Sequence, residues 1–249
     1  IEEARNQKFK IDWENETISE PKNSGIQLIE NQNLEELIPY IDWSPFFRSW
    51  DLFGKYPQIL EDEIVGEHAK ELFADAQKML KKIVAEKLLT AKAIFGIFPA
   101  NSNEQDDIEL KNGEETFTFR TLRQQHKKSD GKEYLALSDF IAPKTSGKQD
   151  YIGAFAVTTG FGTDELAQKY EAEHDDYNAI MVKALADRLA EAFAECMHAR
   201  VRRDLWGYAA AEQLSTEELV KEKYQGIRPA PGYPACPDHS VKRAMFELL

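Results

Sequence analysis

The sequence predicts a mixed α/β fold that is not the doubly wound Rossmann arrangement. Apolar residues recur at helical spacing over residues 64–89 and 163–206, and three shorter runs have the composition of β-strands. A glycine-rich GxGxxG turn between a strand and a helix marks the common nucleotide-binding fold. The sequence contains no such turn. We therefore expect helices packed on a sheet, with any ligand site built in another way.

Size, charge and cysteine content restrict the class of protein. The 249 residues suffice for a buried core, and no apolar run approaches the roughly 20 residues of a membrane span. A formal charge of −13 opposes binding to nucleic acid and to anionic membranes. Cys196 and Cys236 fit a reducing compartment and belong to no metal-binding cluster. We expect a cytoplasmic protein with neither kind of partner.

The two ends of the chain differ from its body. Residues 1–33 are rich in Asn, Glu and Lys and predict an arm or linker, within which Lys8 to Trp13 has the composition of an edge strand. The chain starts without a methionine and closes in an apolar helical stripe, Val241 to Leu249, that lacks a stop signal. These features predict a piece of a longer protein, with residues 34–249 as its domain. The alternative is a natural C-terminal helix that docks and ends there.

An aspartate surrounded by aromatic residues follows this arm. Leu34 to Ile38 predicts a short helix halted by Pro39. In the next segment, Tyr40 to Trp50, Asp42 lies among large apolar side chains. Two interpretations of Asp42 are equally supported by the residues, namely an N-cap for a turn beginning near Ser44 and a carboxylate held for a ligand.

The middle of the chain predicts a scaffold helix followed by strands. Ile64 to Leu89 repeats apolar residues at helical spacing, with Lys and Glu on the other side. Thr90 to Pro99 is a continuous apolar run typical of a buried strand, and the acidic stretch 101–107 predicts a loop. Asn112-Gly113 is a hairpin turn signal before an alternating strand at Glu115 to Leu122.

A third strand leads into long helices. Tyr151 to Thr158 predicts the strand, which Gly160 and Gly162 end. Thr163 to Trp206 predicts one or two long helices with a single apolar side. Within it, the acidic-rich run His174 to Asp176 is better explained as a helix cap than as metal ligands, because no second His or Cys cluster accompanies it. We expect no metal site.

Three acidic residues lie one helical turn apart in the last of these stretches. They are Asp187, Glu191 and Glu195. Like charges at this spacing repel, which would suit an acidic patch that awaits a partner. A solvated helix face is the favoured interpretation.

A capping box introduces the carboxyl-terminal part. Ser215 and Glu218 have the spacing of an N-cap residue and its reciprocal partner. We expect a short helix that runs to about Tyr224 and is terminated by Gly226. Glu222 would then lie in the last turn, where a carboxylate opposes the helix dipole unless a cation is near. A bound sulfonium or a neighbouring lysine would supply that cation.

The segment Tyr224 to Pro237, which we call the track, organises the rest. It holds four prolines, two glycines, two tyrosines and one arginine in fourteen residues. Proline restricts φ and lacks an N–H, so Ile227 to Pro237 should be stiff, extended and poor in internal hydrogen bonds. Arg228 is a fork suited to a carboxylate, and Tyr233 offers an aromatic face. The residues support a small-molecule seat and a rigid connector equally.

Four stretches resemble one known family. The run EELVKEKYQGI followed by RPAPGYPACPDH resembles the AdoMet-binding signature of the activation domain of cobalamin-dependent methionine synthase. IDWSPFF at 41–47, GKYPQILEDEIVG at 54–66 and HDDYNAIMVKALADRLAEAFAE at 174–195 match the same family in the same order. The resemblance therefore spans most of the chain.

The resemblance implies a fold and a function. The fold is α/β of the α+β type, a curved body with a twisted antiparallel sheet and packed helices. The function is to present AdoMet for the reductive methylation of inactive cob(II)alamin to methylcobalamin, within an enzyme that transfers a methyl group from 5-methyltetrahydrofolate to homocysteine. The implied partners are the cobalamin-binding module of the same polypeptide, which holds the cobalamin, and a flavodoxin-type electron donor.

The resemblance also assigns site residues. It implies that Arg228 clamps the AdoMet carboxylate, Ala230 contacts adenine and Asp42 meets the amino group. Tyr233 and Glu222 match residues beside the reacting methyl. Asp187 matches an acid at the face that meets the cobalamin module.

The resemblance also bears on the completeness of the pocket and on docking. The family's domain continues past the point where this chain ends, so we expect the pocket to lack a further aromatic contact. Docking acidic flavodoxin onto an acidic chain would need a local basic patch, such as Arg200, Arg202 and Arg203. Two other functions fit the same sequence, namely a docking module without its own ligand and a stand-alone methyltransferase of unusual fold. In isolation we expect AdoMet binding without turnover.

Overall fold

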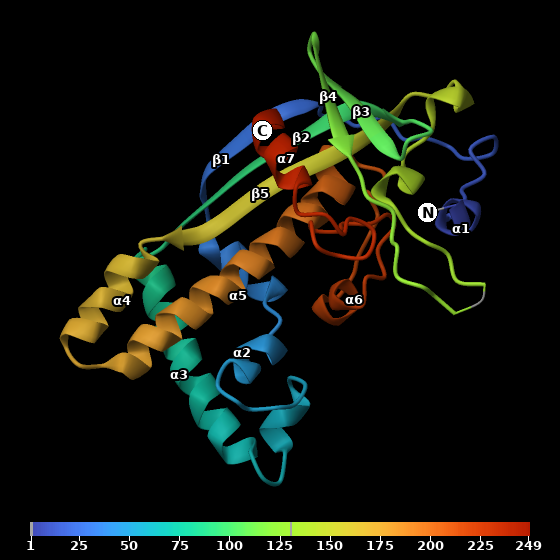
Figure 1. Cartoon of the computed structure of the whole chain (residues 1–249). Helices are drawn as coiled ribbons and strands as arrows, with labels where there is room; N and C mark the ends of the chain where they lie inside the picture. Colours follow the sequence, from blue (N-terminus) through green and yellow to red (C-terminus); the bar gives the residue numbers. More distant parts are fainter. Residues whose placement is uncertain (1, 130) are drawn as a thin grey trace.

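A five-stranded antiparallel sheet is the centre of the computed structural model, which describes residues 2–129 and 131–249 (Figure 1). The strands are β1 Gly25–Gln32, β2 Thr90–Ser102, β3 Asp107–Asn112, β4 Glu115–Arg120 and β5 Asp150–Phe161. Strand β2 pairs with β5 along one edge, and with β1 and then β3 along the other. This confirms the predicted antiparallel sheet with packed helices.

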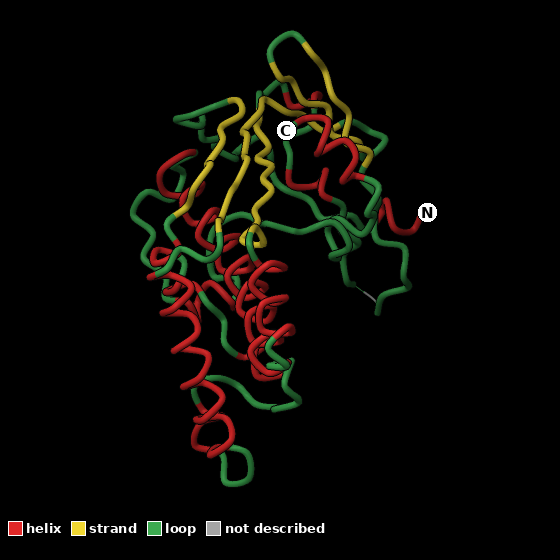
Figure 2. The backbone as a smooth tube through the Cα atoms, turned by 90° about the vertical axis from the view of Figure 1, so that its left-hand side faces the viewer, coloured by secondary structure: helices red, strands yellow, loops and turns green. Residues whose placement is uncertain are grey.

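Three long helices lie on one side of this sheet, and the longest of them packs on β5. They are α3 Gly66–Ala85, α4 Thr163–Ala172 and α5 Asp176–Arg200, and α5 continues into a π-helical turn at Val201–Leu205. Successive side chains of a strand point to opposite faces. Accordingly Phe95 and Ile97 of β2 lie in the helix-facing core, whereas Phe98 and Ala100 lie in a second core on the other face. Figure 2 shows the helical part extending away from the strands.

The second core ties down the carboxyl-terminal part of the chain. It includes Cys236 from the track and Val241 and Leu248 from helix α7, Val241–Leu248. The two cysteines are free and buried. Among the described residues, no helix is long and apolar enough to cross a membrane.

The predicted helices and strands of the middle region are confirmed with small shifts. Helix α3 lies within the predicted stretch, the hairpin turn joins β3 to β4, and β5 runs through Gly160 instead of ending there. The predicted long helical stretch is two helices, because His174 adopts a φ of 58° between them. Asp175 caps the second helix by accepting a hydrogen bond from the Asn178 N–H at 3.0 Å.

The amino-terminal expectations need correction. The segment Lys8 to Trp13 is not a strand, since only an isolated bridge joins Lys8 to Tyr134, and the preceding residues form the short helix α1, Glu2–Asn6. Residues 25–32, expected in an arm, are the edge strand β1 instead. Pro39 does not end a helix, because it lies inside a second 3-10 turn, Ile38–Tyr40, that follows Leu34–Glu36.

Candidate functional site

Helix α6 leads the chain into the track. It spans Thr216–Val220, and Ser215 caps it as predicted by accepting from the Glu218 N–H at 3.3 Å while its own N–H donates to Glu218 at 3.1 Å. The helix does not reach Tyr224. It ends at Val220, and Glu222 adopts a φ of 53° just beyond it. Exposed Glu222 therefore lies outside the helix, and the expected conflict with the helix dipole does not arise.

Tyr224 anchors the start of the track on α5 and its π-helical turn. Its ring meets the His198 ring edge-on, with centroids 4.7 Å apart, and the Arg202 guanidinium carbon lies 4.5 Å from its centroid. One residue further, the Gln225 carbonyl accepts a hydrogen bond from the Tyr208 hydroxyl at 3.4 Å. The entry to the track is thus fixed by aromatic and cation–π contacts.

The track consists of an open half and a folded half. Within the described chain, no backbone N–H of residues 227–231 donates a hydrogen bond to another backbone group. Residues 230–236 instead form a turn in which Tyr233 N–H donates to Ala230, Gly232 N–H to Cys236, and Cys236 N–H to Tyr233, at 3.1, 2.8 and 2.8 Å. The extended conformation predicted up to Pro237 is therefore correct only for the first half.

Glycine is required at the tip of that turn. Gly232 has a φ of 108°, and a Cβ added there would lie 2.7 Å from the His239 ring. The neighbouring Tyr233 is 63% exposed, and Ala230 is also exposed. Buried Cys236 holds the end of the turn in the second core. We call this shallow, solvent-facing turn of residues 230–236 the ledge, and Cys236 anchors it to the body of the protein.

Arg228 is paired with an internal acid. Its Nη2 contacts Oε1 of Glu195 on α5, and the two side chains are 25% and 20% exposed. Glu195 therefore does not belong to a solvated helix face, which corrects that interpretation for this residue. Burial raises the pKa of the Glu195 carboxyl, while attraction from Arg228 and Arg202 opposes the shift. The track itself is not sealed, because its turn remains exposed.

A buried ion pair, formed by Arg202 and Glu212, lies near the Arg228–Glu195 pair. Arg202 is fully buried and its Nε donates to both carboxylate oxygens of Glu212 at 3.0 Å. Burial, together with Arg202 and Arg228, lowers the pKa of His198 to about 3, so its imidazole is neutral.

The basic docking patch suggested by the sequence is mostly occupied within the chain. Because Arg202 is buried, it cannot belong to such a patch, and Arg200 pairs with Glu36 at 2.6 Å. Of the three arginines that the sequence suggested for this patch, Arg200 and Arg202 therefore pair with glutamates of the same chain.

Sequence reasoning missed the supporting role of His198, Arg202 and Glu195. Their positions on a predicted helix gave no sign of it, because the contacts link residues far apart in the chain. The π-helical turn after Arg200, which places Arg202 near Tyr224, has no marker in the sequence that could have indicated this role. Only the tertiary structure brings the end of α5 into contact with Tyr224 at the start of the track.

Asp42 acts as a local cap. Its Oδ1 accepts from the Ser44 N–H at 3.0 Å, at the start of helix α2, Ser44–Arg48. The Thr216 hydroxyl donates to the Pro39 carbonyl at 2.6 Å, which joins α6 to the segment before Asp42. No hydrogen bond or ion pair within the described residues links Asp42 to the track. The half-buried carboxylate keeps its second oxygen for another donor.

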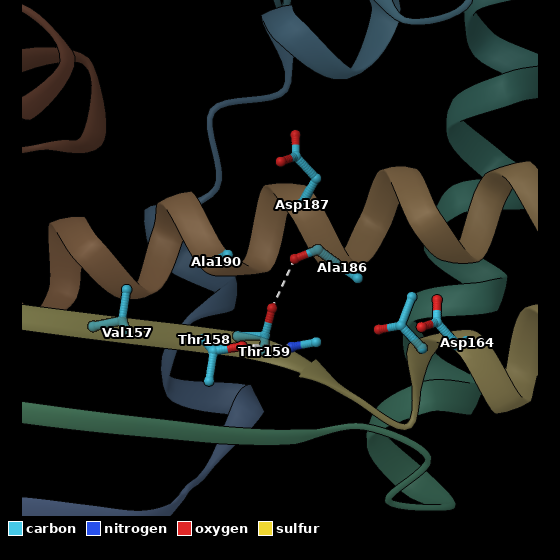
Figure 3. Close-up of a pocket in the computed structure, with 9 residues that line it drawn as sticks. Val157, Thr158, Thr159, Asp164, Ala186, Asp187 and Ala190 are labelled. Atoms are coloured by element: carbon cyan, nitrogen blue, oxygen red, sulfur yellow. Dashed lines mark hydrogen bonds between the residues drawn. The ribbon is translucent and has the colours of Figure 1, made fainter. Parts of the chain in front are cut away.

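Asp187 belongs to a different surface. It pairs with Arg188, is 66% exposed at its side chain, and points away from β5 (Figure 3). A hollow of about 360 Å³ lies beside it between β5, the start of α4 and the middle of α5, where the Thr159 hydroxyl donates to the Ala186 carbonyl at 2.7 Å. No track residue lines this hollow. In the described part of the chain, no three His, Cys, Asp or Glu side chains are grouped to hold a metal ion.

Comparison with known proteins places this geometry in a family. The family model for the vitamin B12-dependent methionine synthase activation domain matches residues 33–249. A solved structure described as the MetH reactivation domain bound to AdoHcy is 55% identical in sequence, with a TM-score of 0.92. The match covers 100% of this chain and 77% of that one. The chain therefore belongs to the family of activation domains of vitamin B12-dependent methionine synthase.

Proposed function

We propose that this chain is the AdoMet-binding reactivation module of a cobalamin-dependent methionine synthase. It presents AdoMet so that cob(II)alamin, after one-electron reduction, is methylated to methylcobalamin. The observation that carries the proposal is the ledge itself, an exposed turn beside a lone, partly satisfied arginine. A 55% identical solved structure described as bound to AdoHcy supports the choice of ligand.

Each predicted site residue has a role suited to AdoMet. Arg228 binds the ligand carboxylate through charge-assisted hydrogen bonds. Ala230, whose backbone N–H has no backbone acceptor, contacts the adenine edge. Asp42 meets the ammonium with its remaining oxygen. These three groups account for the carboxylate, the adenine and the amino group of the ligand.

Tyr233 and Glu222 act at the reacting end of the ligand. The exposed Tyr233 ring lies beside the sulfonium methyl, where an aromatic face stabilises positive charge. Glu222 adds a carboxylate whose negative charge helps to raise the pKa of both Glu195 and Tyr224. Because the ledge is shallow, the methyl group stays open to an acceptor brought by another module.

The wider assembly is part of the proposal. Residues 34–249 form the activation domain and residues 1–33 a linker, although β1 contributes an edge strand to the sheet. Cobalamin is held by another module of the same polypeptide, Asp187 lies at the face that meets it, and a flavodoxin-type protein supplies the electron. Alone, in the cytoplasm or in solution, this chain binds AdoMet without turnover.

Calorimetric titration with AdoMet and AdoHcy tests this function. We expect heat of binding with one site per chain for both compounds. A docking module without its own ligand would give no heat with either. Addition of free cob(II)alamin and a chemical reductant separates the third function, because a stand-alone methyltransferase would form methylcobalamin catalytically, as followed by its absorption spectrum.

A further inference from the structure

The Arg228–Glu195 pair is incomplete in a specific way. It is made through a single contact, from Nη2 of Arg228 to Oε1 of Glu195, and Arg228 also lies near the Tyr224 hydroxyl, where it opposes the rise that burial causes in the Tyr224 pKa. Two further atoms of the same pair, Nε of Arg228 and Oε2 of Glu195, are buried and have no hydrogen-bond partner. Buried polar atoms without partners are rare in folded proteins and call for an explanation.

The unpartnered donor and the unpartnered acceptor belong to two side chains that already meet through Nη2 and Oε1, and Nη1 of Arg202 and Nδ1 of His198 are also buried without a partner. A guanidinium offers two edges to carboxylates, one formed by Nε and Nη2 and the other by Nη1 and Nη2. Glu195 already touches Nη2, and the adjacent Nε and the second Glu195 oxygen are both free. Glu195 therefore contacts Nη2, the nitrogen that the two edges share. No geometric hydrogen bond of Nη1 is found among the described residues, so Nη1 remains for another carboxylate.

The same molecule contains a guanidinium with both edges filled. Nε and Nη2 of Arg123 donate to Asp106 at 3.1 and 2.6 Å, and Nη1 and Nη2 donate to Asp139 at 2.6 and 2.7 Å. One arginine can thus seat two carboxylates in this protein. Arg228 meets one acid where Arg123 meets two, and its Nε has no hydrogen-bond partner.

Arg228 needs support from outside its own segment. It lies in the open half of the track, where no backbone N–H among residues 227–231 donates to another backbone group. Glu195 projects from the long helix α5 and is only 20% exposed at its side chain, so its position is set by a rigid element. Groups that are held in the bound orientation before binding lower the entropic cost of recognition.

We infer that Glu195 is the positioning residue for the ligand carboxylate. It holds Nη2 of Arg228 against α5 and leaves Nη1 free to meet AdoMet. This inference rests on the proposed function, because it concerns the carboxylate subsite of the same ligand. It predicts that Glu195 contributes to affinity only through Arg228 and only for ligands that carry the carboxylate.

The test compares two ligands across matched variants. Affinities for AdoMet and for decarboxylated AdoMet, which lacks the carboxylate, are measured for the wild type, Glu195→Ala, Arg228→Ala and the double variant. The control is Glu36→Ala, which removes another glutamate paired with an arginine of α5. Thermal unfolding of each variant confirms that it is folded.

The expected results separate positioning from general support. Glu195→Ala weakens AdoMet about tenfold and changes the affinity for decarboxylated AdoMet by less than about twofold. In the Arg228→Ala background the same substitution adds no further loss. Glu36→Ala leaves both affinities unchanged.

Other outcomes overturn the inference. Equal weakening of both ligands would mean that Glu195 only supports the fold, and tighter AdoMet binding would mean that it competes with the ligand. Unchanged binding in Glu195→Ala, with normal binding in the wild type, removes this inference and leaves the proposed function intact. A wild-type chain that binds neither compound overturns both.

Discussion

Two arginines in this molecule are held in opposite ways. Arg123, 5% exposed, donates to two aspartates and to the Tyr134 carbonyl at 2.7 Å, so that all three of its nitrogens are used. Arg228 makes one contact with one glutamate and keeps a buried nitrogen without a partner. Both side chains meet internal acids, yet only the first has its hydrogen-bonding capacity filled.

The difference distinguishes a structural tie from a binding group. Arg123 joins the exit of β4 to the 3-10 turn Leu137–Phe140 by way of Asp139, and its local surroundings leave no room for a further ligand. Arg228 lies beside the exposed ledge, where Nη1 of the guanidinium can meet solvent or a ligand. An ion pair therefore does not by itself remove an arginine from function. The number of its donors that remain free is the better criterion.

Replacing Arg123 should have the largest effect and should act on stability alone. Arg123→Ala leaves Asp139, whose side chain is 3% exposed, as a buried carboxylate without its cation. We expect the free energy of unfolding to fall by about 3–5 kcal/mol, as for other broken buried ion pairs. Urea denaturation measures the loss. A loss below about 1 kcal/mol would contradict the view of Arg123 as a structural tie.

Replacing Arg228 should act on ligand binding instead. Arg228→Ala removes the partner of the ligand carboxylate, and we expect AdoMet binding to weaken by about 2–4 kcal/mol. Because the pair with Glu195 is partly exposed, the change in stability should be about 1 kcal/mol or less. Calorimetry and urea denaturation of the same preparation check both values. Undiminished affinity would remove Arg228 from the site.

A glycine substitution compares the turns of the two regions. In Gly232→Ala the new Cβ meets the His239 ring at a φ of 108°, whereas in Gly113→Ala, in the β3–β4 hairpin, it meets open space at a φ of 61°. We expect Gly232→Ala to cost about 1–3 kcal/mol of stability and to weaken AdoMet binding. Gly113→Ala should cost about 1–2 kcal/mol and spare binding. Equal binding by both variants would show that the turn at the ledge is not needed.

The buried histidine beneath the track should make stability depend on pH. The pKa of His198 is about 3 in the folded chain, so the unfolded chain binds the extra proton between pH 3 and roughly 6.5. Unfolding is therefore favoured as the pH falls through this window, with a slope of up to about 1.4 kcal/mol per pH unit. Comparing wild type with His198→Gln isolates this share from that of the carboxylates. Parallel pH profiles for the two proteins would rule it out.

Local patterns in the sequence predicted much of the fold. The helical spacing around α3 and α5, the hairpin turn before β4 and the capping box at Ser215 each depend on neighbours within a few residues, and each is confirmed. The cap at Asp175 is confirmed for the same reason. The resemblance of the track and three other stretches to one family was sufficient to identify the family. These features could be predicted because each depends only on residues that are contiguous in the sequence.

Contacts between distant residues were decided only by the tertiary structure. Strand β1 pairs with β2, and its pattern did not predict it because the apolar Ile26 and Leu28 lie exposed whereas Gln32 is buried. Glu195 and Asp187 are indistinguishable as helical acids spaced by whole turns, yet Glu195 is largely buried against Arg228 whereas Asp187 is exposed beside its neighbour Arg188. The sequence determined which chemical groups are present and which local elements they form. Their partners depend on how those elements pack, because burial and pairing of a charge arise from residues far apart in the chain.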